Sequence, residues 1–172
     1  MYEFYVGTTP KDPPGNIVKV CLDSDGQLVD KSYYEAVSPA YLCRKGSCIY
    51  AVIENADFGG VQVFDVNKNG SLTAKARLDT EDVYSTYISA EKRGNRIFVA
   101  NYGTPSCAVY RYEAEKLVQE SVLREKKTEK SHIHCAALTP EEAYVCLVDV
   151  GTDEILVYAA DSLELVDTVK FP

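Results

Sequence analysis

The chain has 172 residues, of which 46% are hydrophobic and 26% are charged, a balance typical of a soluble globular protein. Its formal net charge of −8 disfavours nucleic acids and anionic membranes as partners, although a local group of His and Arg can still bind a small anion. No stretch approaches the roughly 20 apolar residues of a membrane-spanning helix. Residues 1–7 lack the basic region and apolar core of a secretory signal, so we expect a cytoplasmic protein.

The six cysteines give no sign of a disulfide framework or a metal site. Cys48, Cys135 and Cys146 lie inside apolar runs, where a free cysteine behaves as a small hydrophobic residue. No Cys-x-x-Cys pair and no Cys/His cluster at zinc spacing occurs. We therefore expect reduced cysteines, no metal and no cofactor. A disulfide between Cys43 and Cys48, which flank a predicted turn, is the one alternative.

The predicted elements are all short strands, and they come in sets along the chain. Residues 2–37 contain an incomplete set, with strands at 4–8 and 17–22 and a further strand ending near 37. Three sets of four strands follow, rich in β-branched and aromatic residues. Their predicted strands are 41–44, 49–53, 61–66 and 72–78; then 86–89, 97–101, 108–112 and 117–123; then 133–138, 144–149, 155–159 and 163–169.

An internal repeat relates the three complete sets. The segments Gly46–Val52, Gly94–Ala100 and Glu142–Val148 can be superposed at a spacing of 48 residues, each as a turn followed by an apolar strand. A period of this length built from short strands is typical of a β-propeller, in which each repeat is one four-stranded blade. The sequence therefore predicts an all-β protein with three complete blades plus three strands of another.

The predicted blade boundaries follow from this repeat. Blade one is incomplete and spans 2–37, blade two 38–79, blade three 83–125 and blade four 131–172. The innermost strand of blade one is missing. Three interpretations stay open: the chain is about half of a longer, seven-bladed propeller, it pairs with a second copy to complete a ring, or it closes alone as a four-bladed ring.

Connectivity sorts the loops onto two faces, because the chain reverses direction with each strand. The loops after the second strands and the links between blades emerge on one face, and the tight polar turns emerge on the other. Both histidines of the chain lie on the first face, at the central channel. The polar residues that we expect to converge there are Glu54, Asn101, Tyr102, His132, His134 and Asp149.

Other interpretations of these residues stay open at this point. Asn101 and Asp149 stand near glycines and are compatible with turn formation alone, and Glu54 with a solvated loop acid. Each histidine taken singly is compatible with a structural role. A His-x-His pair also suits a metal, but no third and fourth ligand is evident.

Several segments resemble the motifs of a known family, in the same order. They are Tyr5–Thr8, Ser38–Leu42 followed by Ile49–Glu54, Val99–Gly103, His132–Cys135 and Asp149–Asp153. In these segments the chain resembles the seven-bladed propeller lactonases, which include bacterial 6-phosphogluconolactonase and the fungal carboxymuconate lactonizing enzyme. The chain departs from the family pattern at Ile53, where the family often has Asn, and in being shorter than family members.

The resemblance implies a lactone hydrolase of the pentose phosphate pathway, acting on a small anionic sugar-phosphate lactone. Hydrolysis needs a general base, for which His134 or His132 is the best candidate, and Glu54 or Asp149 would orient its ring. Asn101 and Tyr102 would hold substrate hydroxyls. The channel face offers no arginine for the phosphate, so we expect the missing part of the propeller to supply cations and the chain alone to have little activity.

Two other functions remain open. A carboxymuconate-type cycloisomerase would use the same fold to interconvert a lactone and an unsaturated acid by proton transfer. A non-enzymatic interaction platform is the other possibility, because a propeller fold does not fix function.

Overall fold

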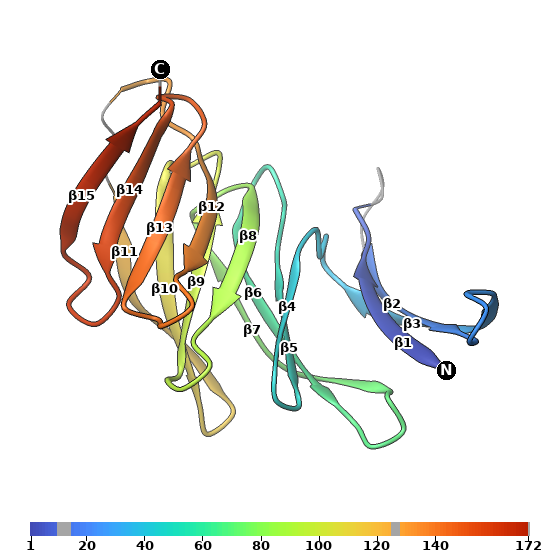
Figure 1. The fold of residues 1–172 in the computed structure, drawn as a ribbon. Helices are drawn as coiled ribbons and strands as arrows, with labels where there is room; N and C mark the ends of the chain where they lie inside the picture. The colour runs from blue at the N-terminus through green and yellow to red at the C-terminus, as the bar shows by residue number, and fades with distance from the viewer. Residues whose placement is uncertain (10–14, 125–127, 172) are drawn as a thin grey trace.

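The computed structural model describes residues 1–9, 15–124 and 128–171. Its regular elements are fifteen strands, which form one three-stranded and three four-stranded antiparallel sheets (Figure 1). The predicted fold class, three complete propeller blades plus three strands, is confirmed. No helix in these three described ranges is long and apolar enough to cross a membrane.

Each sheet follows the chain order of its strands. The first sheet contains β1 (Tyr2–Gly7), β2 (Gly15–Leu22) and β3 (Leu28–Ala36). The second contains β4 (Leu42–Lys45), β5 (Cys48–Val52), β6 (Gly59–Val66) and β7 (Leu72–Thr80). The third contains β8 (Ser85–Ala90), β9 (Arg96–Asn101), β10 (Ser106–Glu113) and β11 (Lys116–Leu123). The fourth contains β12 (Ile133–Leu138), β13 (Tyr144–Asp149), β14 (Glu154–Ala159) and β15 (Leu165–Lys170).

The repeat of the sequence is a repeat of the structure. The second strands β5, β9 and β13 begin at Cys48, Arg96 and Tyr144, which are 48 residues apart. Where the blades themselves begin and end stays a prediction, and the expected ends of blades three and four at 125 and 172 lie outside the described residues.

Apolar side chains fill the space between neighbouring sheets, because each strand alternates its side chains between two faces. One buried cluster joins the first two sheets, one joins the second and third, and one joins the third and fourth. Their largest members include Ile17 and Phe64, then Val63 and Tyr110, then Phe98 and Leu147. The sheets therefore stack as blades that share their cores in pairs.

The inner strands hold the blades together at the centre. β8 contacts both β4 and β12, and the Ser89 hydroxyl of β8 donates a hydrogen bond of 2.6 Å to the Ala136 carbonyl of β12. The first sheet differs, because β1 is the strand at its inner edge. Within the described residues β1 pairs only with β2, and its other edge is free. The predicted absence of an inner strand in blade one is thus seen in the structure.

The four sheets form an open row, with the first and the fourth at opposite ends (Figure 1). The interpretation that the chain closes alone as a four-bladed ring is therefore wrong for this structure, because the end sheets do not meet. Completion of a ring by further blades or by a second copy stays a prediction.

The six cysteines are all free thiols. Cys43 lies opposite Tyr50 and Cys48 opposite Lys45 in the β4–β5 ladder, so the two thiols do not face each other as a disulfide requires. Burial raises the pKa of the Cys43 thiol to about 12. The alternative of a Cys43–Cys48 disulfide is wrong for this structure.

Candidate functional site

We call the face formed by the links between blades and the loops after the second strands the link face; its described residues lie within 8–9, 37–41, 53–58, 81–84, 102–105, 130–132 and 150–153. The same backbone hydrogen bond recurs here in three blades, from the loop after the second strand to the link before the first strand. The donor and acceptor pairs are Glu54 with Ser38 at 3.0 Å, Tyr102 with Tyr84 at 2.9 Å and Val150 with His132 at 3.0 Å. The repeat therefore places these links and loops next to one another, as the connectivity predicts.

A hollow of about 270 Å³ opens on the link face. Five side chains from three blades line it, namely Glu54, Tyr84, Thr86, Tyr102 and His134. Glu54 follows β5, Tyr102 follows β9, and His134 lies on β12. The structure thus brings together three of the six residues expected to converge, although they lie far apart in the sequence.

His134 owes its position to a β-bulge. Ile133 pairs with Asp149 and Cys135 with Val148, so His134 is an extra residue that has no partner in the ladder. A bulge of this kind re-aims a side chain and is frequent beside functional sites. His134 is exposed, and its imidazole is therefore available to a ligand in the hollow.

The preceding blade has the same bulge. Ser85 pairs with Asn101 and Tyr87 with Ala100, which leaves Thr86 as the extra residue of β8. Its hydroxyl lies 3.3 Å from the carbonyl oxygen of His134. The bulge of one blade thus contacts the bulge of the next, and this contact fixes the backbone that carries the exposed imidazole.

Tyr102 is held by both histidines. The His132 ring stacks on the Tyr102 ring with centroids 4.2 Å apart and planes at 7°, and the His134 ring meets it edge-on at 6.0 Å. His132 Nδ1 lies 3.0 Å from the Tyr102 carbonyl oxygen. Because a carbonyl only accepts, the Nδ1 atom must carry a proton, and Nε2 is the basic nitrogen of the neutral ring. His132 therefore supports Tyr102 and does not itself line the hollow.

Tyr84 and Thr86 line the hollow but were not predicted from the sequence. Tyr84 stands 48 residues before His132, and Thr86 stands 48 residues before His134. Applying the repeat to the links as well as to the strands would have found both. The spacing of 48 residues is therefore the sequence signal that identifies Tyr84 and Thr86.

Asn101 and Asp149 do not reach the hollow. Asn101 has no exposed surface and Asp149 is 2% exposed, because each ends its strand with the side chain turned into the blade. The following residues, Tyr102 and Val150, face outward, as alternation along a strand requires. The expectation that Asn101 and Asp149 point into the channel is wrong for this structure.

The buried amide of Asn101 links three elements. Its Oδ1 accepts a hydrogen bond of 2.7 Å from the Ser85 hydroxyl, and its Nδ2 donates one of 3.0 Å to the Ser106 hydroxyl. The Ser85 hydroxyl in turn accepts 3.1 Å from the Gly60 amide of the neighbouring blade. Asn101 therefore holds in place the chain on either side of Tyr84 and Tyr102.

The buried carboxylate of Asp149 organises the link that carries His132. It accepts hydrogen bonds from the Ser131 hydroxyl, from the His132 amide at 2.8 Å and from the Gly151 amide at 3.0 Å. Burial on its own would raise the pKa of this carboxyl, but the hydrogen bonds outweigh burial and hold the pKa below its ordinary value. Asp149 is therefore ionised near neutral pH and positions the link.

The charge of the hollow is set by one carboxylate. Glu54 is the single acidic residue that lines it, and no Lys or Arg is among the five lining residues. In residues 1–9, 15–124 and 128–171, no three His, Cys, Asp or Glu side chains are grouped to hold a metal ion. The arrangement offers a base, two phenols and an acceptor for hydroxyl groups.

A larger hollow of about 480 Å³ lies between the outer strands β7 and β11. Its charged residues include Asp82 and Arg124, which already pair with each other at 2.9 Å, and no histidine lines it. Asp82 also contacts the Ser106 hydroxyl at 3.3 Å. We therefore take the smaller hollow on the link face as the candidate site.

Relatives with known sequences match this chain along nearly its whole length. A protein of Staphylococcus saprophyticus is 28% identical over 182 residues, covering 97% of this chain and 53% of the relative. The 6-phosphogluconolactonase of Bacillus subtilis is 29% identical over 170 residues, covering 91% of this chain and 49% of that enzyme. The chain thus spans about half the length of the curated relatives it matches.

Solved structures show the same fold. The periplasmic gluconolactonase of Pseudomonas aeruginosa superposes with a TM-score of 0.83 at 22% identity, covering 99% of this chain and 55% of that one. A protein of Lactobacillus plantarum superposes with a TM-score of 0.78 at 20% identity, covering 98% and 52%. The family model described as the lactonase with a seven-bladed β-propeller matches residues 3–171. This chain therefore belongs to the seven-bladed β-propeller lactonase family.

Proposed function

We propose that this chain carries part of the active site of a lactone hydrolase that acts on a sugar lactone, as 6-phosphogluconolactonase does. The observation that carries the proposal is the convergence of Glu54, Tyr102 and His134, from three blades, on one hollow of the link face. Membership of the lactonase family and the named activity of the Bacillus subtilis relative support it. Placement in the pentose phosphate pathway and in the cytoplasm stays a prediction.

His134 is the general base of the proposed reaction. Its exposed imidazole takes a proton from a water molecule, whose oxygen forms a bond to the lactone carbonyl carbon. The ring C–O bond then breaks, and the imidazolium returns its proton to the leaving alkoxide. Each turnover consumes one lactone and one water molecule and yields one open-chain hydroxy acid.

Tyr102 is the proposed donor to the oxyanion that forms in the first step. Its phenol lines the hollow beside His134, and a phenolic O–H can donate to a developing negative charge. The stacked ring of His132 and the hydrogen bond at Nδ1 hold Tyr102 in place. His132 thus acts as a positioning residue, through Tyr102.

The test is lactone hydrolysis by the natural polypeptide that carries these residues. We expect His134→Gln to lower turnover about 100-fold or more, the contribution of a general base, with unchanged stability because the side chain is exposed. The matched control Glu141→Gln changes an exposed residue on the opposite face and leaves turnover unchanged.

Two results would contradict the proposal. If His134→Gln turned over lactone as fast as the unmodified protein, His134 would not be the general base. Turnover of a muconate in place of a sugar lactone would favour the cycloisomerase. The expectation that residues 1–172 alone have little activity is tested separately, since hydrolysis by this chain that His134→Ala abolishes would refute it.

A further inference from the structure

Two aromatic rings form the walls of the hollow on the link face. The Tyr84 side chain is 42% exposed and lines the hollow together with Tyr102. An exposed ring that faces a hollow presents a flat apolar surface, and such surfaces are typical of small-molecule sites in which a few polar groups fix orientation. The C–H faces of a sugar ring match this surface.

Tyr84 is held in place at a conformational cost. Its backbone φ of 53° lies in the left-handed region, which residues other than glycine rarely adopt. Its amide donates a hydrogen bond of 2.9 Å to the Asn55 carbonyl, and its carbonyl accepts one of 2.9 Å from Tyr102. The backbone that carries the Tyr84 ring is therefore pre-organised before a ligand binds, which lowers the entropy lost on binding.

Gly103 gives the Tyr84 ring its place. A Cβ atom at Gly103 would lie 2.7 Å from Tyr84 Cδ2, closer than real contacts allow. The glycine therefore permits the ring to pack against the loop after β9. This close approach explains why a strained tyrosine can keep one orientation.

The polar groups of the hollow suit hydroxyls and not a phosphate. The Glu54 carboxylate accepts hydrogen bonds from hydroxyl groups, whereas it repels a phosphate, which carries about −1.5 to −2 charge at neutral pH. None of the five lining residues is Lys or Arg. Within the described residues, the hollow thus offers a phosphate no permanently charged cation.

Resting on the proposed function, we propose that this hollow binds the uncharged, hydroxyl-bearing ring of the lactone against Tyr84 and Tyr102, with Glu54 accepting from ring hydroxyls. A phosphate on the same substrate lies outside the hollow. The chain therefore binds an unphosphorylated sugar ring at least as tightly as its phosphorylated form. Tyr84 is a specificity-determining residue for the ring.

The test is an NMR titration of residues 1–172 with glucose and with glucose 6-phosphate, two stable rings that undergo no hydrolysis. We expect glucose to bind at least as tightly as glucose 6-phosphate. Tyr84→Ala should weaken glucose binding about three- to tenfold, and Tyr84→Phe should retain it. Tyr144→Ala is the matched control, because Tyr144 is 44% exposed and lies away from the hollow.

Glu54→Gln separates charge from packing. We expect it to weaken glucose binding and to strengthen glucose 6-phosphate binding relative to glucose, because it removes the repelling charge. Tighter binding of glucose 6-phosphate by the unmodified chain, an unchanged affinity in Tyr84→Ala, or binding of neither ring would overturn the inference. Ring binding without any lactone turnover in the natural polypeptide would overturn the proposed function alone.

Discussion

The link face and the opposite face differ in how their polar groups are used. We call the opposite face, formed by the tight turns at 23–27, 45–47, 67–71, 92–95, 114–115, 140–143 and 160–164, the turn face. There, side chains of one blade bind the backbone of the next: Lys45 contacts the Gly94 carbonyl, and Glu142 accepts from the Lys92 amide. The tight polar turns of this face therefore form joints between blades.

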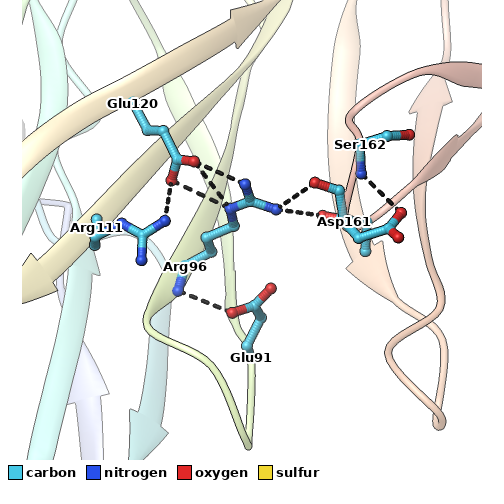
Figure 2. A network of polar contacts seen from close by, with 7 residues as sticks. Glu91, Arg96, Arg111, Glu120, Asp161 and Ser162 are labelled. Carbon is cyan, nitrogen blue, oxygen red and sulfur yellow. Dashed lines mark hydrogen bonds and ion pairs between the residues drawn. The ribbon is translucent and has the colours of Figure 1, made fainter.

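Arg96 is the centre of the joint between blades three and four (Figure 2). Its guanidinium donates to the Ala160 carbonyl at 2.7 Å, to the Asp161 carbonyl at 2.9 Å and to the Glu120 carboxylate at 2.7 Å. Arg111 contacts the same carboxylate at 3.1 Å. The hydrogen bond from Arg96 holds the pKa of Glu120 below its ordinary value. The Arg96 guanidinium and the Glu120 carboxylate therefore have their partners inside the protein.

The hollow of the link face shows the reverse. Within the described residues, the Glu54 carboxylate, the hydroxyls of Tyr84 and Tyr102 and the His134 ring nitrogens make no hydrogen bond. Groups without internal partners are the ones that a ligand can use. The comparison teaches that the turn face uses its side chains to join blades, while the hollow of the link face keeps its polar groups for binding.

The largest effect that would sharpen this contrast comes from Arg96→Met. Loss of the guanidinium leaves two carbonyls without their donor and Glu120 with Arg111 alone, at a cost of about 2 to 3 kcal/mol in the free energy of unfolding. Urea unfolding measures it. Arg111→Met is the control, since that exposed side chain makes one contact to Glu120 and should cost less than about 1 kcal/mol. Equal losses of stability in the two variants would contradict the central role of Arg96 in the joint.

Asn101→Leu should come next, at about 2 kcal/mol. The substitution keeps the approximate size of a fully buried side chain but leaves the hydroxyls of Ser85 and Ser106 without one partner each. Unfolding by urea again measures it, and glucose affinity should fall as the links around the hollow loosen. A variant with wild-type stability would show that the amide supports nothing.

Gly103→Ala tests the seat of the Tyr84 ring. The new Cβ would lie 2.7 Å from Tyr84 Cδ2 and 2.7 Å from Val83 Cγ2, so both side chains must move. We expect a loss of about 1 kcal/mol in stability and a fall of a few-fold in glucose affinity. Gly26→Ala offers a glycine with open space around it as a control, although its φ of 78° adds local strain. Unchanged glucose affinity in Gly103→Ala would contradict the placement of the ring.

The smallest effect concerns pH and Asp149. A carboxyl whose pKa is lowered on folding stabilises the folded state above the ordinary carboxyl pKa of about 3.9, and this contribution disappears as the pH falls through the folded-state value. Asp149→Asn should therefore cost about 0.5 to 1 kcal/mol at pH 7 and flatten the loss of stability on acidification. Stability measured against pH in both proteins would show it. Parallel curves would mean that Asp149 does not titrate with folding.

The strands were predictable because short apolar runs and a repeat of 48 residues mark them directly. β12 and β13 begin and end at the residues that the pattern predicts, and connectivity alone placed both histidines on the link face. These properties depend on local preferences and on chain direction, and both can be read from sequence.

The details of the site were less predictable, for physical reasons. A bulge adds one residue to a strand without changing its hydrophobic pattern, so the exposure of His134 and the contact with Thr86 have no signal in a single blade. The inward position of Asn101 could have been predicted from the sequence. Tyr102 follows it, and neighbouring residues on a strand face opposite ways. The bonds of Arg96 depend on how two blades pack, which no local pattern records.

The central claim, that the link face binds and the turn face joins, is tested most directly by mapping one ligand on the folded chain. Glucose titrated into isotopically labelled residues 1–172 should shift the NMR signals of Glu54, Tyr84, Tyr102 and His134. Signals from Arg96 and from the turn face should stay where they are. Shifts centred on the turn face, with the hollow unaffected, would contradict the account.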